Sequence, residues 1–311
     1  MSGKRWLVVG VIAITLVIAL IFLQGGLTSY WGEKPQFSLV PPERPAAEPE
    51  GVPGTEVGAG WSRRQEADQA LEEAAAMALK GKPATPPDFA IIFASSGSDL
   101  PGILAAARKL WGEKTKIFGG TSDSRAVLTN KGFIKAAAKG YEPQLHERAL
   151  ALMTVTSRDI GFAVGAADFG AYATVREASQ AALRRALKSA GRPIQDKPQV
   201  ILTTISHGDE DEALAGIEAE MGKSAPVLGG TAGGPRFGIL GKNNVFPRGI
   251  SLAVIYTRLP MGLVFEGGFD KVDTPGGVVT KVEGRAIVEI NGKPALDLYD
   301  EWLGGQVRKL I

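Results

Sequence analysis

The chain contains no cysteine, and this absence removes several kinds of chemistry at once. Without a thiol there is no disulfide, no thiolate metal site, no cysteine nucleophile and no lipidated cysteine anchor. Histidine is also scarce, since the only two are His146 and His207. General bases and metal ligands are therefore few, while the lack of cysteine fits either side of a membrane.

An excess of charge of one sign is lacking too. The 35 lysines and arginines are scattered among 33 acidic residues, for a net charge of +2, and they form no basic stripe with interleaved aromatics. Nucleic-acid binding needs such a stripe, so no nucleic-acid partner is expected. With 44% hydrophobic residues in 311, the chain can bury a sizeable core in about two domains.

One long hydrophobic run is present, at the N-terminus. Residues 6–23 carry no charge, and with their flanks they approach the roughly 30 Å hydrocarbon core of a bilayer. Lys4 and Arg5 precede the run, whereas Tyr30 and Trp31 follow it. This predicts a single-pass transmembrane signal anchor over 6–24, with residues 1–5 cytoplasmic and the body extracytoplasmic at the cell membrane. The alternative is a cleaved signal peptide, which would leave the body secreted or periplasmic.

Residues 25–56 are predicted to form a proline-rich tether. Apolar residues are few between 33 and 60, so this stretch cannot bury enough surface to offset the entropy of ordering. The folded body is expected to begin at Val57.

The body repeats itself. A Gly-Gly-Thr sequence follows an apolar run at 119–121 and again at 229–231, an offset of 110 residues, and Gly112 maps onto Gly222 with the same offset. This predicts two similar halves, at 57–165 and 166–275, packed together with a ligand site at the seam between them.

Each half shows the same order of expected elements, which gives a mixed α/β fold class with mixed sheets and internal duplication. Capping-box spacings at 62–65 and 174–177 predict the first helix of each half. Apolar runs at 89–94 and 200–205 predict buried strands. Further strands are expected at 149–155 and 160–164 in the first half, and at 250–256 and 261–265 in the second. Residues 276–311 predict a hairpin and a short helix, the truncated start of a C-terminal region.

Taken together, these segments resemble the N-terminal part of the FIST (F-box and intracellular signal transduction) domain family, followed by only the start of its C-terminal part. The resemblance rests on residues 90–94, 118–122, 227–233 and 284–295, and it covers about 57–304. It implies a sensory domain that binds small ligands, with amino acids or their derivatives proposed. The chain has no kinase, cyclase or methyl-accepting output region, so a signal would pass to a separate signalling partner.

The candidate ligand-binding residues follow the strands, because ligands in open α/β sheets bind beyond the carboxyl ends of strands. The glycines would let backbone N–H groups approach an anion, although a structural turn explains them as well. Each glycine pair precedes an arginine that could grip a carboxylate, or that could be a solvated loop residue. The predicted set is Ser95, Ser96, Gly119, Gly120, Thr121, Ser122 and Arg125 in the first half, and Ser206, His207, Gly229, Gly230, Thr231 and Arg236 in the second.

Metal, cofactor and catalysis receive less support. His207 adjoins an acidic run that helix capping explains, so no metal and no cofactor are expected. A haem held by His207 is an alternative that the resemblance implies. Ser95 or Ser96 acting with His207 as a hydrolase or transferase is the rival from another class, although no Gly-x-Ser-x-Gly motif is present. The prediction is therefore a membrane-anchored sensor of a small polar or anionic ligand, not an enzyme.

Overall fold

The computed structural model describes residues 54–82, 85–122, 126–129, 132–135, 148–192, 196–222, 225–234, 236–263, 276–305 and 307–309. The expected anchor, nearly all of the tether, Arg125 and His146 lie outside these ranges. Within them, no helix has both the length and the apolar character needed to cross a bilayer. The described residues divide into two compact units, one up to 263 and one from 276 onwards.

The first sheet of the larger unit has the strand order β1-β6-β2-β3-β10-β11. Strands β2 and β3 run parallel, and the other neighbours run antiparallel. In sheet order the strands are β1 (Thr55–Ser62), β6 (Leu150–Ser157), β2 (Phe89–Ala94), β3 (Lys116–Thr121), β10 (Ile239–Leu240) and β11 (Val245–Phe246).

The second sheet repeats the first four strands of this order. Its order is β7 (Ile160–Asp168), β12 (Gly249–Thr257), β8 (Val200–Ile205), β9 (Val227–Thr231), with only β8 and β9 parallel. The sheets therefore divide between Ser157 and Ile160, whereas the sequence analysis set the boundary after residue 165. The counterpart of β7 is β1, where the sequence pattern predicted no strand.

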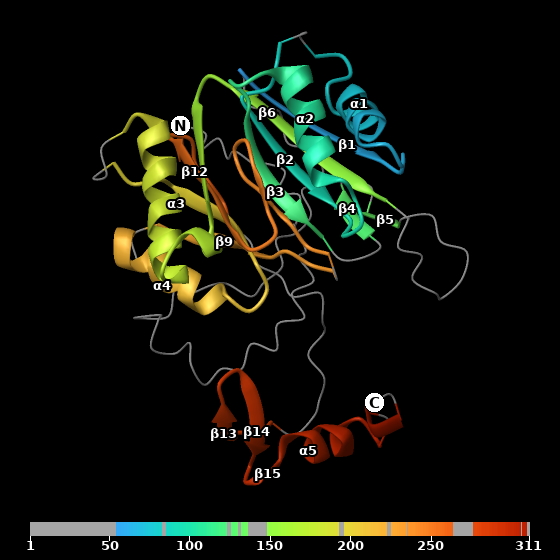
Figure 1. Cartoon of the computed structure of the whole chain (residues 1–311), viewed down its shortest axis with the longest axis vertical. Coiled ribbons are helices and arrows are strands. Elements are labelled where there is room, and N and C mark those ends of the chain that lie inside the picture. Colours follow the sequence, from blue (N-terminus) through green and yellow to red (C-terminus); the bar gives the residue numbers. More distant parts are fainter. Residues whose placement is uncertain are drawn as a thin grey trace, which may run out of the picture. The chain divides into compact units, whose positions relative to one another are not determined.

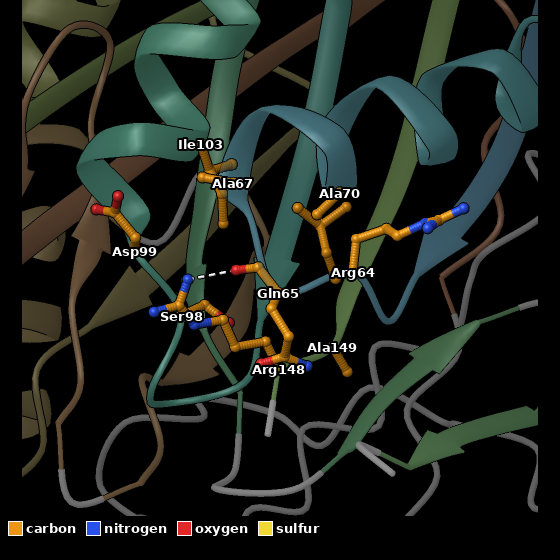
Figure 2. A pocket seen from close by; sticks show the side chains of 10 residues that line it. Arg64, Gln65, Ala67, Ala70, Ser98, Asp99, Ile103, Arg148 and Ala149 are labelled. Carbon is orange, nitrogen blue, oxygen red and sulfur yellow. Dashed lines mark hydrogen bonds between the residues drawn. The ribbon is translucent and has the colours of Figure 1, made fainter. Parts of the chain in front are cut away.

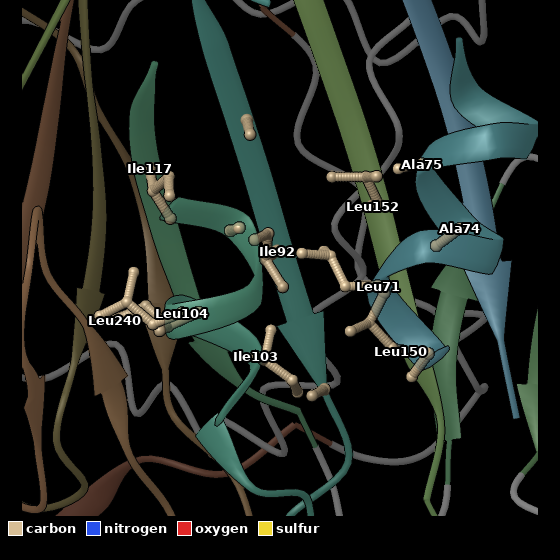
Figure 3. Close-up of a cluster of buried hydrophobic side chains, with 14 of the residues drawn as sticks. Leu71, Ala74, Ala75, Ile92, Ile103, Leu104, Ile117, Leu150, Leu152 and Leu240 are labelled. Carbon is tan, nitrogen blue, oxygen red and sulfur yellow. The ribbon is translucent and has the colours of Figure 1, made fainter. Parts of the chain in front are cut away.

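Helices cover the outer face of each sheet, as Figure 1 shows. The helices α1 (Ala67–Ala78) and α2 (Leu100–Trp111) bury their apolar sides on the first sheet. Figure 3 shows this core, in which Leu71 and Ile103 from the helices meet Ile92 and Leu152 from the strands. The helices α3 (Val175–Ala190) and α4 (Glu210–Met221) cover the second sheet in the same way, after the short 3-10 turn η1 (Phe169–Ala171).

A third apolar cluster lies between the two sheets. It joins Phe89 and Phe118 of the first sheet to Val164 and Ala253 of the second. The ring centroids of Phe89 and Phe162 are 4.7 Å apart, in a stacked arrangement. The two halves are thus packed sheet against sheet, with their helices outermost, and the seam is the inner face of both sheets.

The first helix of each half begins differently. Thr174 caps α3 as its spacing predicts, since its Oγ1 accepts a hydrogen bond from the Glu177 amide at 3.1 Å. The capping box predicted at 62–65 is wrong, because Ser62 ends β1 and its Oγ donates to Glu73 at 2.5 Å. Helix α1 begins at Ala67, and its N-cap Glu66 makes no side-chain cap hydrogen bond.

A hairpin follows the Gly-Gly-Thr strand in both halves, but the two hairpins lie in different places. In the first half β4 (Ala126–Thr129) and β5 (Gly132–Lys135) form a separate two-stranded sheet. In the second half β10 and β11 extend the sheet of the first half instead, with Ile239 paired to Gly120 and Leu240 paired to Gly119. Strand β9 is consequently the last strand of its sheet. The described residues 261–263 belong to no strand, unlike the prediction for 261–265.

The smaller unit contains the predicted hairpin and helix. Its elements are β13 (Val279–Glu283), β14 (Ala286–Ile290), β15 (Lys293–Pro294), α5 (Ala295–Trp302) and the short 3-10 turn η2 (Val307–Lys309). The turn after β14 uses a left-handed backbone at Asn291, where φ is 53°. Ile290 and Leu298 are its buried apolar residues.

Candidate functional site

Both Gly-Gly-Thr strands need their first glycine for the sheet itself. Gly119 and Gly229 have φ of +145° and +156°, values that residues with a side chain rarely adopt. A Cβ on Gly119 would lie 1.8 Å from the Ile92 carbonyl oxygen, and a Cβ on Gly229 would lie 1.8 Å from that of Thr203. The two glycines therefore let β3 and β9 pair closely with their neighbours.

The serines that end β2 and β8 hold neighbouring strands together. The buried Ser95 Oγ accepts a hydrogen bond from the Ala149 amide at 2.9 Å. The buried Ser206 Oγ likewise accepts from the Gly249 amide at 2.5 Å and donates to the Gly249 carbonyl at 2.9 Å. Ser96 is buried as well. The hydroxyls of Ser95 and Ser206 are committed to matching backbone groups in the two halves.

The threonines of the repeat sit where the halves meet. Thr121 is buried, its Oγ1 accepts from the Gly238 amide at 3.1 Å, and its carbonyl accepts from the Gly233 amide at 3.2 Å. The loop after β9 thus crosses to the end of β3 and carries the exposed Arg236 with it. Ser122 is half-buried, and its amide donates to Ala94 at 2.7 Å.

At the end of the second sheet, the Glu210 carboxylate contacts polar groups of three other residues. It accepts a hydrogen bond from Thr231 Oγ1 at 2.8 Å and another from the Gly208 amide at 3.0 Å. Its carboxylate also lies 3.9 Å from His207 Nδ1. Gly229 is exposed at this end, and Gly230 is half-buried.

His207 does not lie in surroundings that suit haem. Its side chain is 78% exposed on a polar turn, whereas an axial ligand needs an apolar pocket that encloses the macrocycle. His207 Nδ1 lies 3.9 Å from the Glu210 carboxylate, whereas the Ser95 Oγ accepts a hydrogen bond from the Ala149 amide. In the same part of the chain, no three His, Asp or Glu side chains are grouped to hold a metal.

An arginine that the sequence analysis passed over lies beside this cluster. Arg248 donates to both Asp209 oxygens, from Nε at 2.9 Å and from a terminal nitrogen at 2.5 Å. The hydrogen bonds to Asp209 raise the pKa of Arg248, and the charge of Asp209 adds to the effect. Asp209 is the N-cap position of α4, so the pair ties this helix to the start of β12.

Two buried hydroxyls on the inner face of the second sheet have no partner in the described residues. Thr204 Oγ1 and Ser251 Oγ are both enclosed, and both residues are 0% exposed. The residues are direct partners on β8 and β12, so they share a face. Thr204 faces the first sheet, because a Cβ on Gly120 would lie 3.1 Å from its methyl group. The sequence analysis missed both residues.

The first half shows that the fold does not need hydroxyls at these positions. Ile92 pairs with Gly119 as Thr203 pairs with Gly229, which makes Phe93 the counterpart of Thr204. The partner of Phe93 on β6 is Ala151, which makes Ala151 the counterpart of Ser251. The first half thus has an apolar pair where the second half has the polar pair Thr204 and Ser251, and Thr204 lies against Gly120 of the first sheet.

A cavity near the start of α2 is too small to hold a ligand. It encloses about 10 Å³, which holds about one water molecule. Figure 2 shows Arg64, Ser98 and Arg148 around it, with Arg148 donating a hydrogen bond to the Gln65 carbonyl.

Comparison with known proteins identifies the family. Two solved structures match the chain with low TM-scores and low sequence identity. One, a cyanuric acid hydrolase from A. caulinodans, has a TM-score of 0.35 and 11% identity, covering 67% of this chain and 69% of that one. The other, described as "Cyanuric acid hydrolase: evolutionary innovation by structural concatenation", has a TM-score of 0.34 and 13% identity, covering 69% and 72%. No curated protein matches. Residues 88–293, more than half of the chain, match the FIST N domain. The chain therefore belongs to the FIST family, as its sequence motifs predict.

Proposed function

We propose that this protein is a membrane-anchored sensor that binds a small polar ligand, such as an amino acid or a related carboxylate, at the seam between its two halves. FIST domains are signal-transduction sensor domains, which gives the class of function. The site lies at the ends of β3 and β8, around Gly120, Thr121, Thr204 and Ser251. Binding changes the packing of the two sheets, and a partner protein reads that change.

The unpartnered hydroxyls of Thr204 and Ser251 carry this proposal. A buried polar group without a hydrogen bond costs about 1–3 kcal/mol, and most such groups in proteins have a partner. The counterparts Phe93 and Ala151 show that the same sheet position accepts apolar side chains. A ligand that hydrogen-bonds to both hydroxyls offsets their cost and so favours the bound arrangement of the seam.

The proposal is for binding without catalysis. The Ser95 hydroxyl accepts a hydrogen bond from the backbone, and the exposed His207 lies next to Glu210. Arg236 stands on the loop that joins β9 to β3, where it can attract an anionic ligand to the seam.

A thermal-shift screen over amino acids and small carboxylates tests the ligand. A ligand at about 100 times its Kd stabilises the native state by about 2.7 kcal/mol, which raises Tm by about 5–10 °C for a body of this size. The double variant Thr204→Val, Ser251→Ala keeps the shape of the site and removes both hydroxyls. It should fold, with unchanged or higher Tm in the absence of ligand, and lose the ligand-induced rise.

Two results would count against the site. Failure of every compound to raise Tm in the wild type removes the sensor proposal. An equal rise in the double variant removes Thr204 and Ser251 from the site. Arg236→Ala serves as the control for charge, since it should weaken an anionic ligand and leave a neutral one unaffected.

The location is tested separately. We expect the full chain to remain in the membrane fraction after alkaline carbonate extraction, and a chain without residues 1–24 to be released. A mature N-terminus found after residue 24 would show instead that the apolar run is a cleaved signal peptide.

A further inference from the structure

A groove between α1 and α2 lies away from the seam, on the outer side of the first half. The two helices lie side by side over the sheet in Figure 1. Ala75 and Ala76 of α1, with its C-cap residue Leu79, line the groove together with Leu110 and Trp111 of α2. The cavity has a volume of about 430 Å³, and small-molecule sites range over about 300–1,000 Å³.

The second half provides an internal reference for this groove. Gly60 and Gly165 are equivalent, because both are paired to the counterpart leucines Leu152 and Leu252. A Cβ on Gly60 would strike the Ala74 carbonyl, and one on Gly165 would strike that of Ala182. Helix α1 therefore corresponds to α3 with an offset of 108 residues.

The other pair of helices aligns at its ends. Gly112 and Gly222 both cap their helices, with amides bonded to Arg108 and Glu218 respectively. Helix α2 therefore corresponds to α4 with an offset of 110 residues.

With these offsets, the residues that line the groove have bulky or charged counterparts. Ala75 and Ala76 correspond to Leu183 and Arg184, while Leu110 corresponds to Glu220. In the second half Arg184 grips Glu220 with two hydrogen bonds of 2.7 Å, which join α3 to α4. In the first half the same place has two alanines opposite a leucine, and the space between the helices is open.

Lys82 gives the groove an N–H donor for a ligand. Lys82 donates to the carbonyls of Val57 and Ala78, each at 2.7 Å, and these use two of its three N–H groups. The Nε1 of Trp111 is buried and has no partner among the described residues. The counterpart of Trp111 is Met221, which has no N–H group. Glu72 lies toward the other end of the groove, one turn before Ala76.

We propose that this groove binds an aliphatic carboxylate. The hydrocarbon chain lies between Ala75, Ala76, Leu79 and Leu110, and the carboxylate accepts the third hydrogen bond of Lys82. The negative head is at the Lys82 end because Glu72 would repel it at the other. The small residues of α1 provide the space that Leu183 and Arg184 fill in the second half.

Octanoate is the test ligand, titrated calorimetrically into the full chain in lipid nanodiscs. The double variant Ala76→Arg, Leu110→Glu installs the ion pair of the second half, which the same helix geometry accommodates there. We expect octanoate affinity to fall at least about tenfold, or about 1.4 kcal/mol, because the new side chains occupy the space of the hydrocarbon chain. The matched control Arg184→Ala, Glu220→Ala should leave octanoate affinity unchanged. If the first double variant fails to fold, Ala75→Leu, which mimics Leu183, should reduce affinity in the same direction.

The charge of the head group is tested with Lys82→Gln. A charge-assisted hydrogen bond accounts for about ten- to hundredfold in affinity, so octanoate should weaken by that factor while 1-octanol is unaffected. Three results would overturn the proposal: no octanoate binding to the wild type, equal binding to the Ala76→Arg, Leu110→Glu variant, or octylamine binding as tightly as octanoate.

Discussion

At the residue scale, the first glycine of each Gly-Gly-Thr strand cannot carry a side chain without strain. Gly119 and Gly229 combine an unusual φ with a facing carbonyl that leaves no room for a side chain. Gly112 has a φ of 70° at the end of α2, but nothing lies within 4 Å of a Cβ placed there. The same substitution therefore has different costs at the two kinds of site.

Gly119→Ala should destabilise the protein by more than about 3 kcal/mol, because backbone strain and the clash with Ile92 add together. Gly112→Ala has only the strain of its backbone, where φ is 70° and ψ is −166°, and should cost about 1–3 kcal/mol. Urea unfolding followed by circular dichroism measures both. Equal losses in the two variants would show that β3 can move away from β2 to accept a methyl group.

A second residue, Tyr256, contributes to the dependence of stability on pH at alkaline values. Burial raises the pKa of its phenol, Asp196 adds to the rise, and Arg192 opposes it. In the unfolded chain the phenol ionises near about pH 10, while the folded chain keeps its proton to higher pH. Above that pH the unfolded state binds fewer protons, so the free energy of unfolding falls as pH rises.

Tyr256→Phe should remove this alkaline fall. It also removes a buried hydroxyl that has no partner among the described residues, so stability at neutral pH should be unchanged or higher by about 1 kcal/mol. Unfolding free energies at neutral pH and at about pH 10.5 test both effects. A loss of more than about 1 kcal/mol at neutral pH would mean that the hydroxyl is hydrogen-bonded.

At the element scale, the first helices of the two halves differ in how they start. Thr174 caps α3 with a side-chain hydrogen bond, whereas Glu66 at the start of α1 makes none. Thr174→Ala should therefore lower the free energy of unfolding by about 1 kcal/mol. Glu66→Ala, at an exposed position, should change it by less than about 0.5 kcal/mol. Chemical denaturation of the two variants measures both changes in the free energy of unfolding. Similar losses in both would contradict the difference in capping.

Most elements of the body could be predicted from the sequence because their apolar residues recur with a clear period. The buried strands predicted at 89–94 and 200–205 agree with β2 and β8. Strand β1 escaped prediction because Gly58 and Gly60 weaken the β pattern. Those glycines are needed by a tertiary contact, the close approach of α1, which no local signal reveals.

The proposed seam site was only partly accessible from sequence. The duplicated glycines and threonines pointed to the strand ends, and Thr121 does lie where the halves meet. Thr204 and Ser251 lie within their strands and not in the loops after them, and threonine is common in strands for reasons of packing alone. Aligning the halves strand by strand would have revealed them, since Phe93 and Ala151 stand at the same places.

At the scale of the whole molecule, the two halves differ at their outer strands. Strand β3 is covered by β10, and the Thr121 amide donates to the Gly238 carbonyl at 2.9 Å. Strand β9 is the last of its sheet, and alternation along the strand turns the Thr231 amide outwards, since the Ala232 amide points to Ile205. We expect the Thr231 amide to exchange with deuterium at least about 100-fold faster than that of Thr121.

Hydrogen exchange with residue resolution tests this difference. The Gly119 amide should be protected with Thr121, because β10 pairs with both ends of the glycine pair. Comparable protection at Thr121 and Thr231 would mean that another part of the chain covers β9.

The hairpin of β10 and β11 comes from the second half and covers the edge strand β3 of the first half. The stretch of gene that encodes the first half does not encode the strand that shields its own edge, because that strand is supplied more than 70 residues after β7 begins. A chain cut at the turn between Ser157 and Ile160 would leave the first fragment with an open, glycine-rich edge prone to pairing with other chains. The first half therefore depends on the second for the strand that covers its edge, and moving it alone to another protein would expose β3.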